Sequence, residues 1–304
     1  MAKIAWMFPG QGAQSVGMLK DLHALYPQLK QTFDEASDVL HTDLWSLTQQ
    51  GPESQLNSSA WTQPALLTAG IAVFRLWCEQ ERPLPCVVLG HSLGEYTALV
   101  AAGALSFSEA VHLVHLRGTY MQSAVPEGSG LMAAILGLSD EDVTKACHSV
   151  DGSVSPANFN TPGQVVIAGT REAVELAIQA AKALGAKRAL PLAVSVPSHC
   201  ALMQPAAEQF QAALEAVQWQ APRIPVIHNV DACVHPNTFE MIEVLSQQLV
   251  QPVQWVKCVQ ALSGFGVTQA FESGPSAVLT GLVKRIDANI PCTSLEAPAA
   301  WQAV

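Results

Sequence analysis

The sequence from Pro85 to Ala102 reads PCVVLGHSLGEYTALVAA and carries the pattern G-x-S-x-G at residues 90–94. The stretch before the pattern is apolar with β-branched residues, which predicts one short buried strand. The stretch after it is rich in Ala, Leu and Val, which favours a helix. In such a strand-to-helix turn the glycines let the backbone pass closely, and Ser92 stands at the apex.

Ser92 has two interpretations at this point. The pattern is short enough to occur by chance, so the serine can be no more than part of a turn. In the other interpretation Ser92 is a nucleophile, and free N–H groups at the helix N-terminus face an oxyanion. The strand before it and the helix after it favour the nucleophile.

The composition is that of a folded protein with a large core. A chain of 304 residues buries about three quarters of its unfolded surface. With 49% hydrophobic and 13% charged residues it is far from a disordered profile. Its apolar runs are short and interrupted, so no transmembrane helix and no membrane partner is predicted. The N-terminal apolar run predicts a first strand, over residues 3–8, rather than a secretion signal.

Cysteine, histidine and charge narrow the function further. The seven Cys are dispersed without a C-x-x-C pair, which predicts reduced thiols and a cytoplasmic protein. The nine His form no metal-binding pattern, so neither a metal nor a cofactor is predicted. A net charge of −10 argues against nucleic acid as a partner, and an acidic partner would need a local basic patch.

Residues 9–14, PGQGAQ, form a Gly-rich loop that lacks the endings of a P-loop and of a dinucleotide fingerprint. The loop is either a flexible connector or a place where Gln11 and its backbone approach a ligand closely. A helix is predicted near residues 64–80, with Gln63 just ahead of it. At the other end of the chain, the tail after Pro298 is expected to be loose.

A capping box at residues 106–109, SFSE, predicts the start of a helix. One face of this helix carries Ala110, Leu113, Val114, Arg117 and Met121. A guanidinium on an apolar stripe is costly unless an anion pairs with it. Arg117 therefore either reaches the surface or a protein carboxylate, or it binds the carboxylate of a substrate.

In residues 127–196 the expected order of strands and helices differs from that of the flanking segments, which predicts an inserted small domain. The expected strands cover residues 131–138, 153–159, 164–169 and 187–196, with helices over 140–150 and 170–184. This β-α-β-β-α-β order is ferredoxin-like. The flanking segments, 1–126 and 197–304, alternate helix and strand and form one large α/β domain.

His199 lies where the predicted insert ends and a helix begins. A single histidine is more often structural than catalytic, yet a serine nucleophile needs a base. Of the nine His, His199 is the one at a domain junction after the nucleophile. His91 is too close in sequence to turn back on Ser92.

Seven separated stretches together resemble the malonyl-CoA:acyl carrier protein transacylases of bacterial fatty acid synthesis. The stretches are Phe8-Pro-Gly-Gln-Gly-Ala-Gln14, Thr62-Gln-Pro-Ala65, Gly90-His-Ser-Leu-Gly-Glu-Tyr96, Leu116-Arg-Gly118, Asn158-Phe-Asn-Thr-Pro-Gly-Gln164, Val194-Ser-Val-Pro-Ser-His199 and Gln251-Pro-Val-Gln-Trp255. The resemblance covers essentially the whole chain. It implies a hydrolase-like large domain with a mainly parallel sheet, interrupted by the ferredoxin-like insert.

The resemblance also implies roles for individual residues. Ser92 is the expected nucleophile and His199 its base, oriented by the main-chain carbonyl of Gln251. The expected oxyanion donors are the N–H groups of Gln11 and Leu93. Further roles are a carboxylate clamp at Arg117 and an acyl pocket lined by Gln63, Met121 and Asn160.

The implied reaction moves a malonyl group from malonyl-CoA to the pantetheine thiol of an acyl carrier protein, which brings the phosphopantetheine. An acidic carrier needs cations, and the candidates are Arg171, Lys187, Arg188, Lys284 and Arg285. These can equally be scattered solvated charges. Two competing classes are a serine hydrolase, which passes the acyl group to water, and a carrier-binding module without catalysis.

Overall fold

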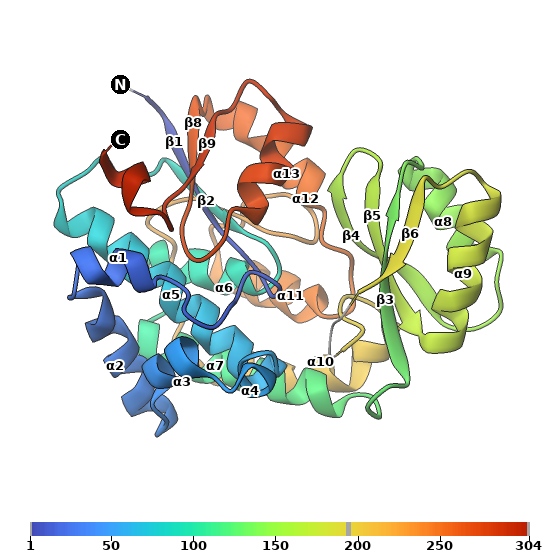
Figure 1. The fold of residues 1–304 in the computed structure, drawn as a ribbon, viewed down its shortest axis with the longest axis horizontal. Coiled ribbons are helices and arrows are strands. Elements are labelled where there is room, and N and C mark those ends of the chain that lie inside the picture. Colours follow the sequence, from blue (N-terminus) through green and yellow to red (C-terminus); the bar gives the residue numbers. More distant parts are fainter. Residues whose placement is uncertain (1, 193–195, 303–304) are drawn as a thin grey trace.

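The computed structural model describes residues 2–192 and 196–302 and contains two β-sheets, each with its own helices (Figure 1). The larger sheet is parallel, in the order β7-β2-β1-β8-β9, and consists of β1 (Ile4–Phe8), β2 (Val87–Gly90), β7 (Val226–Ile227), β8 (Gln269–Glu272) and β9 (Cys292–Ser294). The smaller sheet is antiparallel, in the order β4-β5-β3-β6, and consists of β3 (Gly130–Leu136), β4 (Val154–Thr161), β5 (Gln164–Thr170) and β6 (Arg188–Pro191).

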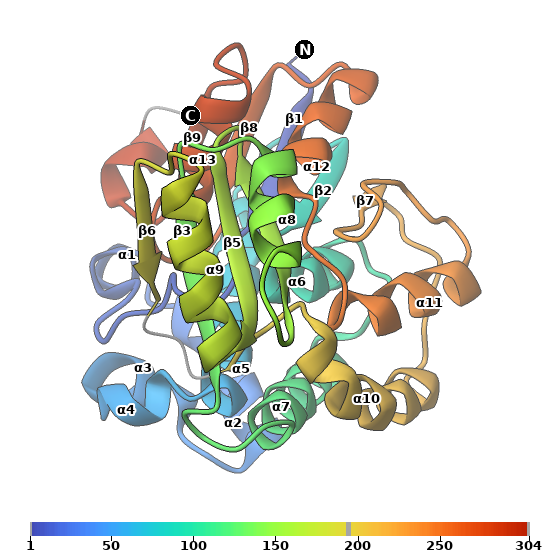
Figure 2. The same cartoon turned by 90° about the vertical axis from the view of Figure 1, so that its right-hand side faces the viewer.

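The helices divide between the two sheets. Those around the larger sheet are α1 (Lys20–Leu25), α2 (Leu29–Leu40), α3 (Leu44–Gln50), α4 (Glu53–Leu56), α5 (Ser59–Glu79), α6 (Leu93–Ala101), α7 (Phe107–Ser123), α10 (Gln204–Ala216), α11 (Thr238–Gln248), α12 (Trp255–Ala261) and α13 (Val278–Ile286). The smaller sheet carries α8 (Asp140–His148) and α9 (Arg171–Ala183), which lie side by side on one of its faces (Figure 2). None of the helices in the described ranges is long and apolar enough to cross a membrane.

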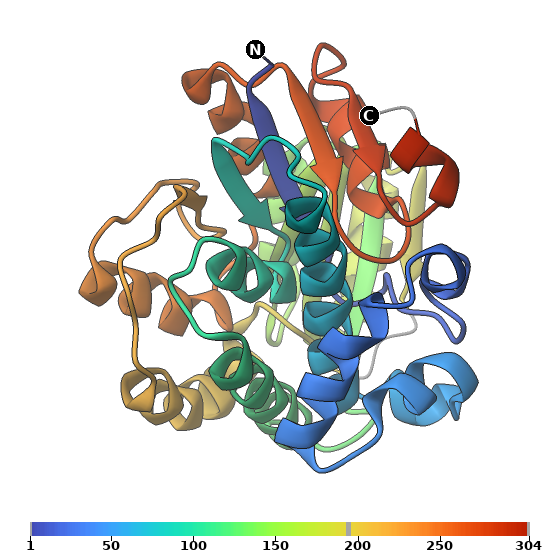
Figure 3. The same ribbon diagram turned by 90° about the vertical axis from the view of Figure 1, so that its left-hand side faces the viewer.

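The main core lies between the larger sheet and α5, a helix buried on nearly all sides (Figure 3). Trp6 on β1 packs edge-on against Phe74 and Trp77 of α5, with ring centroids 5.3 and 4.8 Å apart. Phe271 on the neighbouring strand β8 lies 5.5 Å from Trp6. Aromatic pairs at these distances add stability beyond the burial of their area, so they anchor α5 to the strands that support the site.

Helix α5 begins five residues before the predicted start, and Gln63 and Pro64 lie inside it. A proline within a helix leaves the carbonyl four residues earlier without its usual donor, here that of Ala60. In the structure His115 of α7 forms a hydrogen bond with Ala60 O through Nδ1, at 2.8 Å. A contact between residues 55 positions apart thus lets the helix continue through the proline.

Helix α7 begins where the capping box predicts, and its predicted apolar face is buried. The N-cap Ser106 accepts a hydrogen bond from the Glu109 N–H at 3.3 Å. Near the other end, a Cβ added to Gly118 would lie 2.2 Å from Ser59 O, so the backbones of α7 and α5 touch there. This close packing brings Arg117 of α7 against Gln63 of α5.

The segment after α11 ties the two sheets together. Val253 accepts a main-chain hydrogen bond from Phe159 and donates one to Ala157, both at 2.9 Å. Val253 thereby continues the ladder beyond the edge strand β4, opposite Asn158. The smaller sheet is consequently fixed over one end of the larger one.

Two segments differ from expectation: the strand predicted over residues 187–196 and the C-terminal tail. The last strand of the insert, predicted over residues 187–196, is observed over Arg188–Pro191, and residues 193–195 of that prediction lie outside the described residues. The tail after Pro298 is docked rather than loose through residue 302. It forms a 3₁₀ turn whose Trp301 is buried against Trp77 and Tyr26, and Arg82 donates to the Trp301 carbonyl at 2.9 Å.

Candidate active site

The G-x-S-x-G pattern forms a sharp turn from β2 into α6. Ser92 has φ 52° and ψ −107°, which a non-glycine residue adopts only where the surroundings enforce it. A Cβ on Gly90 would lie 1.9 Å from the Gly94 carbonyl, and one on Gly94 would lie 2.0 Å from Phe8 O. The two glycines are therefore required, because β1, β2 and α6 pack backbone against backbone around Ser92.

Asn229 holds this turn in place. It follows β7, the strand next to β2, so both reach the same edge of the parallel sheet. Its Oδ1 accepts from the Ser92 N–H at 2.6 Å, and its Nδ2 donates to Gly90 O at 2.7 Å. One buried side chain thus bridges the backbone on both sides of His91.

His199 reaches Ser92 from the segment that follows the smaller sheet. Its Nε2 lies 2.8 Å from Ser92 Oγ, and its Nδ1 lies 2.7 Å from the main-chain carbonyl of Gln248. A carbonyl only accepts, so Nδ1 carries the proton and Nε2 accepts from the serine. The orienting carbonyl is that of Gln248, whereas the sequence-based prediction chose Gln251. Gln251 adds a smaller backbone interaction that raises the pKa of His199.

Burial, together with the nearby positive charge of Arg117, lowers the pKa of His199 from 6.5 to about 3. The hydrogen bond to Gln248 acts in the opposite direction but is outweighed. The imidazole is therefore neutral at physiological pH and free to accept the Ser92 proton, which is the state a general base needs.

Arg117 is 1% exposed, which rules out the interpretation that it reaches the surface. Its Nη1 donates to Gln63 Oε1 at 2.9 Å, and its Nη2 to Gln248 Oε1 at 2.8 Å and to Ser92 Oγ at 3.3 Å. Its Nε has no hydrogen-bond partner, and no ion pair among the described residues includes Arg117. A buried guanidinium without a carboxylate in contact lies next to the serine oxygen.

A cavity of about 220 Å³ opens between the two sheets in front of Ser92. The predicted residues that line it are Gln11, Ser92, Leu93, Arg117, Met121, Asn160 and His199. Gln63 is not one of the lining residues; it is buried behind Arg117 and holds the guanidinium. Met132, Val166 and Leu192 of the smaller sheet and its last connection supply apolar surface.

Leu93 and Gln11, whose N–H groups are the expected oxyanion donors, both line the cavity. Leu93 is the first residue of α6, so its N–H has no acceptor within the helix. Gln11 lies in the Gly-rich loop after β1, where a Cβ on Gly10 would come within 2.4 Å of His91 O. The loop is thus pressed against the nucleophile turn, and it is more than a flexible connector.

His91 points to the smaller sheet rather than to Ser92. Its Nε2 lies 2.8 Å from Asn160 Oδ1 at the end of β4, and its ring packs 5.4 Å from that of Trp255. Burial lowers the pKa of His91, so the ring is neutral and Nε2–H donates to the amide oxygen. Asn160 therefore joins the two walls of the cavity.

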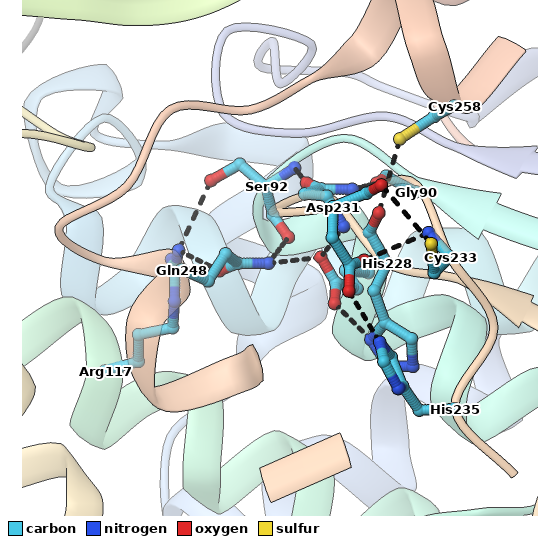
Figure 4. A network of polar contacts seen from close by, with 11 residues as sticks. Gly90, Ser92, Arg117, His228, Asp231, Cys233, His235, Gln248 and Cys258 are labelled. Atoms are coloured by element: carbon cyan, nitrogen blue, oxygen red, sulfur yellow. Dashed lines mark hydrogen bonds and ion pairs between the residues drawn. The ribbon is translucent and has the colours of Figure 1, made fainter. Parts of the chain in front are cut away.

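Four polar residues at the base of the site were not predicted from the sequence: Glu95, His228, Asn229 and Gln248. Figure 4 shows Gln248 beside Arg117 and Ser92, and His228 on the other side of the view with its hydrogen-bond partners. Glu95 and Gln248 lie on helices and carry no local signal. A polar pair directly after a buried strand, His228-Asn229, is a usable signal, because such residues meet at the carboxyl edge of a parallel sheet.

The predicted carrier cations, Arg171, Lys187, Arg188, Lys284 and Arg285, are all exposed. Helix α13 begins at the cavity with Val278, Leu279 and Leu282, and Lys284 and Arg285 follow on its next turn. Arg285 Nη1 also donates to Gln164 Oε1 of β5 at 2.9 Å. In the described part of the chain, no group of three or more His, Cys, Asp or Glu is arranged to hold a metal ion.

Comparison with known proteins agrees with this geometry. Residues 5–285 match the family model of the acyl transferase domain. The malonyl CoA-acyl carrier protein transacylase of Escherichia coli K12 is 53% identical, over 100% of this chain and 99% of the relative, and that of Bacillus subtilis is 46% identical over 98% and 95%.

Two solved structures extend the comparison to the fold. An acyl carrier protein S-malonyltransferase from Vibrio cholerae superposes with a TM-score of 0.96 at 51% identity, covering 99% of both chains. A malonyl-transacylase solved in complex with its type II PKS acyl-carrier protein gives 0.98 at 51% identity, covering 99% and 98%. With these identities over its full length, the chain belongs to the family of malonyl CoA-acyl carrier protein transacylases.

Proposed function

We propose that this protein transfers the malonyl group of malonyl-CoA to the pantetheine thiol of an acyl carrier protein, through an ester on Ser92. The observation that carries the proposal is Arg117. Its guanidinium lies beside the nucleophile and, among the described residues, its Nε has no hydrogen-bond partner and it contacts no carboxylate, so it is suited to the free carboxylate of a malonyl group.

In the first half of the reaction the malonyl carboxylate binds Arg117 and the thioester carbonyl lies against Ser92. His199 Nε2 takes the hydroxyl proton while Ser92 Oγ attacks the carbonyl carbon. The negative oxygen binds the N–H groups of Leu93 and Gln11, and removing one such donor typically costs about 100- to 1,000-fold in rate. The C–S bond then breaks, and CoA thiolate leaves with the proton from His199.

The second half runs by the same steps in reverse order. The pantetheine thiol of the carrier gives its proton to His199 and attacks the malonyl ester. The ester bond breaks and Ser92 recovers its proton from His199. One acyl-enzyme serves both halves, which predicts ping-pong kinetics. The reaction supplies extender units for fatty acid synthesis and draws on no metal or cofactor of the enzyme, because the carrier brings the phosphopantetheine.

Intact-mass spectrometry after brief incubation with malonyl-CoA tests this proposal. We expect a malonyl adduct on Ser92 that disappears when carrier protein is added. Loss of the adduct to water alone would favour the hydrolase instead. A Ser92→Ala variant that retained full function would leave only a carrier-binding module.

Arg117→Ala tests the clamp separately from the transfer chemistry. A hydrogen bond to a charged group contributes about 1.5–3 kcal/mol, so the preference for malonyl-CoA over acetyl-CoA should fall by roughly 10- to 150-fold. The measurement is the ratio of kcat/KM for the two donors. An unchanged ratio would show that the carboxylate binds elsewhere.

The domain organisation is part of the same proposal. We assign residues 127–196 to a ferredoxin-like small domain, and residues 1–126 and 197–304 to a hydrolase-like large one. The β-α-β-β-α-β order, the antiparallel pairing β4-β5-β3-β6 and the two helices on one face support the small-domain assignment. We also place the reaction in the cytoplasm, on the ground that the seven cysteines are free thiols.

A further inference from the structure

Gln248, the last residue of α11, forms hydrogen bonds with four residues of the site. Its main-chain carbonyl accepts from His199 at 2.7 Å. Its side-chain Oε1 accepts from Arg117 Nη2 at 2.8 Å, and its Nε2 donates to Ser92 O at 3.1 Å and to Glu95 Oε2 at 2.6 Å. The side chain is completely buried, and its contacts with Arg117 and Glu95 are shielded from water, whereas the contact with Ser92 O is partly buried.

The side-chain amide of Gln248 has only one acceptable orientation. If it were flipped, its NH₂ group would face the Arg117 guanidinium, donor against donor. Its oxygen would then face the carbonyl of Ser92 and the carboxylate of Glu95, acceptor against acceptor. Because buried groups left unpaired are costly, the surroundings fix the amide with Oε1 directed at Arg117.

Glu95 is the fixed point of this arrangement. It lies on α6, one turn after Ser92, and is 1% exposed. Its Oε1 accepts from His228 Nδ1 at 2.7 Å and its Oε2 from the Asn229 N–H at 3.1 Å. With both oxygens occupied from the outer side of the network, the carboxylate cannot turn away from Gln248.

Arg117 is held by two amide oxygens, but not equally firmly. Gln63 Oε1 accepts from Nη1, while the NH₂ group of Gln63 contacts Met121 Sδ at 3.4 Å, a weak acceptor. Gln248 has strong partners on every polar atom of its amide. Because a planar guanidinium pairs with a carboxylate in a defined plane, the residue that fixes this plane controls the recognition.

We propose that the Gln248 side chain is a specificity-determining positioning residue, which locks Arg117 in the plane that accepts the malonyl carboxylate. The main chain of the same residue orients the base, so Gln248 serves both the chemistry and the choice of acyl group, with different atoms. The inference rests on the proposed role of Arg117 as the carboxylate clamp.

Gln248→Met separates the two functions, because it keeps the carbonyl and the side-chain length and removes the amide. We expect the ratio of kcat/KM for malonyl-CoA over acetyl-CoA to fall about 3- to 10-fold, mainly through a higher KM for malonyl-CoA. A disturbance of Ser92 or His199 lowers kcat/KM for both acyl donors by the same factor, so it cancels in this ratio. Gln247→Met, the same change at the exposed neighbouring position, is the matched control and should leave the ratio unchanged.

The variant Arg117→Ala/Gln248→Met closes a double-mutant cycle. If Gln248 acts through Arg117, the second change adds nothing to the ratio once Arg117 is absent. An equal fall in both backgrounds, or no fall with Gln248→Met where Arg117→Ala has its effect, overturns the inference and leaves the clamp intact. No effect of Arg117→Ala alone would refute the clamp itself. If Gln248→Met does not fold, Gln248→Asn takes its place, since its shorter amide cannot reach both Arg117 and Glu95.

Discussion

At the scale of single residues, the site depends on a neutral base, His199, and a charged guanidinium, Arg117, both of which the fold keeps away from water. His199 stays neutral because burial and Arg117 both disfavour its protonated form. Arg117 stays charged without a carboxylate in contact, supported by amide oxygens and by the face of Tyr96, 5.3 Å away. The same guanidinium thus prepares the base and leaves room for an anionic substrate.

This coupling predicts an unusual pH dependence. With a pKa of about 3 in the folded protein against 6.5 ordinarily, His199 remains a base well below neutral pH. We expect the rate of Ser92 acylation to stay level from pH 8 down to about pH 5. In Arg117→Ala the acidic fall in rate should move to higher pH, because the second-largest cause of the shift is gone.

Acetyl-CoA is the donor to use for this measurement, since it has no carboxylate of its own to titrate. Circular dichroism at each pH is the control. Below pH 6.5 the unfolded chain binds a proton at His199, whereas the folded chain does not. The free energy of unfolding therefore falls as the pH decreases towards 3. A rate that halves near pH 6.5 while the protein stays folded would contradict the prediction.

Glu95 gives a second prediction at this scale, on stability. Three donors converge on its carboxylate, from His228, Asn229 and Gln248, and a glutamine offers them only one oxygen. Glu95→Gln should therefore lower the free energy of unfolding by about 1–3 kcal/mol, measured by urea denaturation.

The matched control for this change is Glu208→Gln. Glu208 is exposed on α10 and accepts one hydrogen bond, from Gln204. This substitution should stay within about 0.5 kcal/mol of the parent. An equal decrease in the free energy of unfolding for the two variants would mean that the buried carboxylate of Glu95 contributes no more to stability than an exposed one.

At the scale of elements, close backbone approach places the clamp. A Cβ on Gly118 would meet the Ser59 carbonyl at 2.2 Å, and neither backbone can yield without separating α7 from α5. Gly118→Ala should cost about 1–3 kcal/mol of unfolding free energy and should weaken malonyl preference, because Arg117 is the adjacent residue.

Gly281→Ala is the comparison, in the middle of α13. Apart from its chain neighbours and its own helix backbone, no atom of the described residues lies within 4 Å of the position where its Cβ would be, so this change should instead stabilise the protein by about 0.4–1 kcal/mol. The free energy of unfolding of both variants is measured by denaturant titration. A higher value for Gly118→Ala than for the parent protein would show that α7 and α5 are not in contact at this point.

The elements also show what the sequence could and could not predict. Arg117 was found because helical periodicity is a local property, and the turn at Ser92 because its glycines have a local steric cause. The start of α5 was missed because it depends on His115, which supplies a distant donor to Ala60. The family resemblance assigned the orienting carbonyl to Gln251, whereas His199 Nδ1 is hydrogen-bonded to the carbonyl of Gln248, three residues earlier, because the resemblance gives no local signal that separates the two.

At the scale of the whole molecule, the active site is closed by two sheets that meet around it. The larger sheet supplies the nucleophile turn and the Gly-rich loop, and the smaller sheet supplies Asn160 and an apolar wall. Val253 and the His91–Asn160 pair fix one to the other. We therefore expect a thioester arm to enter between the two sheets beside α13, whose first residues line the cavity.

The surface of α13 beside the cavity carries two cations. The protein carries a net charge of −10, so an acidic carrier is repelled except where cations gather. Lys284 and Arg285 follow directly on the cavity-lining turn of α13. Arg188, in contrast, precedes the lining residue Leu192 by four strand positions, about 13 Å.

We therefore expect Lys284→Glu/Arg285→Glu to reduce kcat/KM for the carrier protein far more than that for malonyl-CoA. Each half-reaction is measured by following the Ser92 adduct as it forms and as it is discharged. Lys187→Glu/Arg188→Glu reverses the same number of charges farther from the cavity and should have a smaller effect, which added salt diminishes further. The docking surface would lie elsewhere if kcat/KM fell equally for malonyl-CoA and for the carrier protein. The same would follow if Lys187→Glu/Arg188→Glu reduced kcat/KM for the carrier protein more strongly.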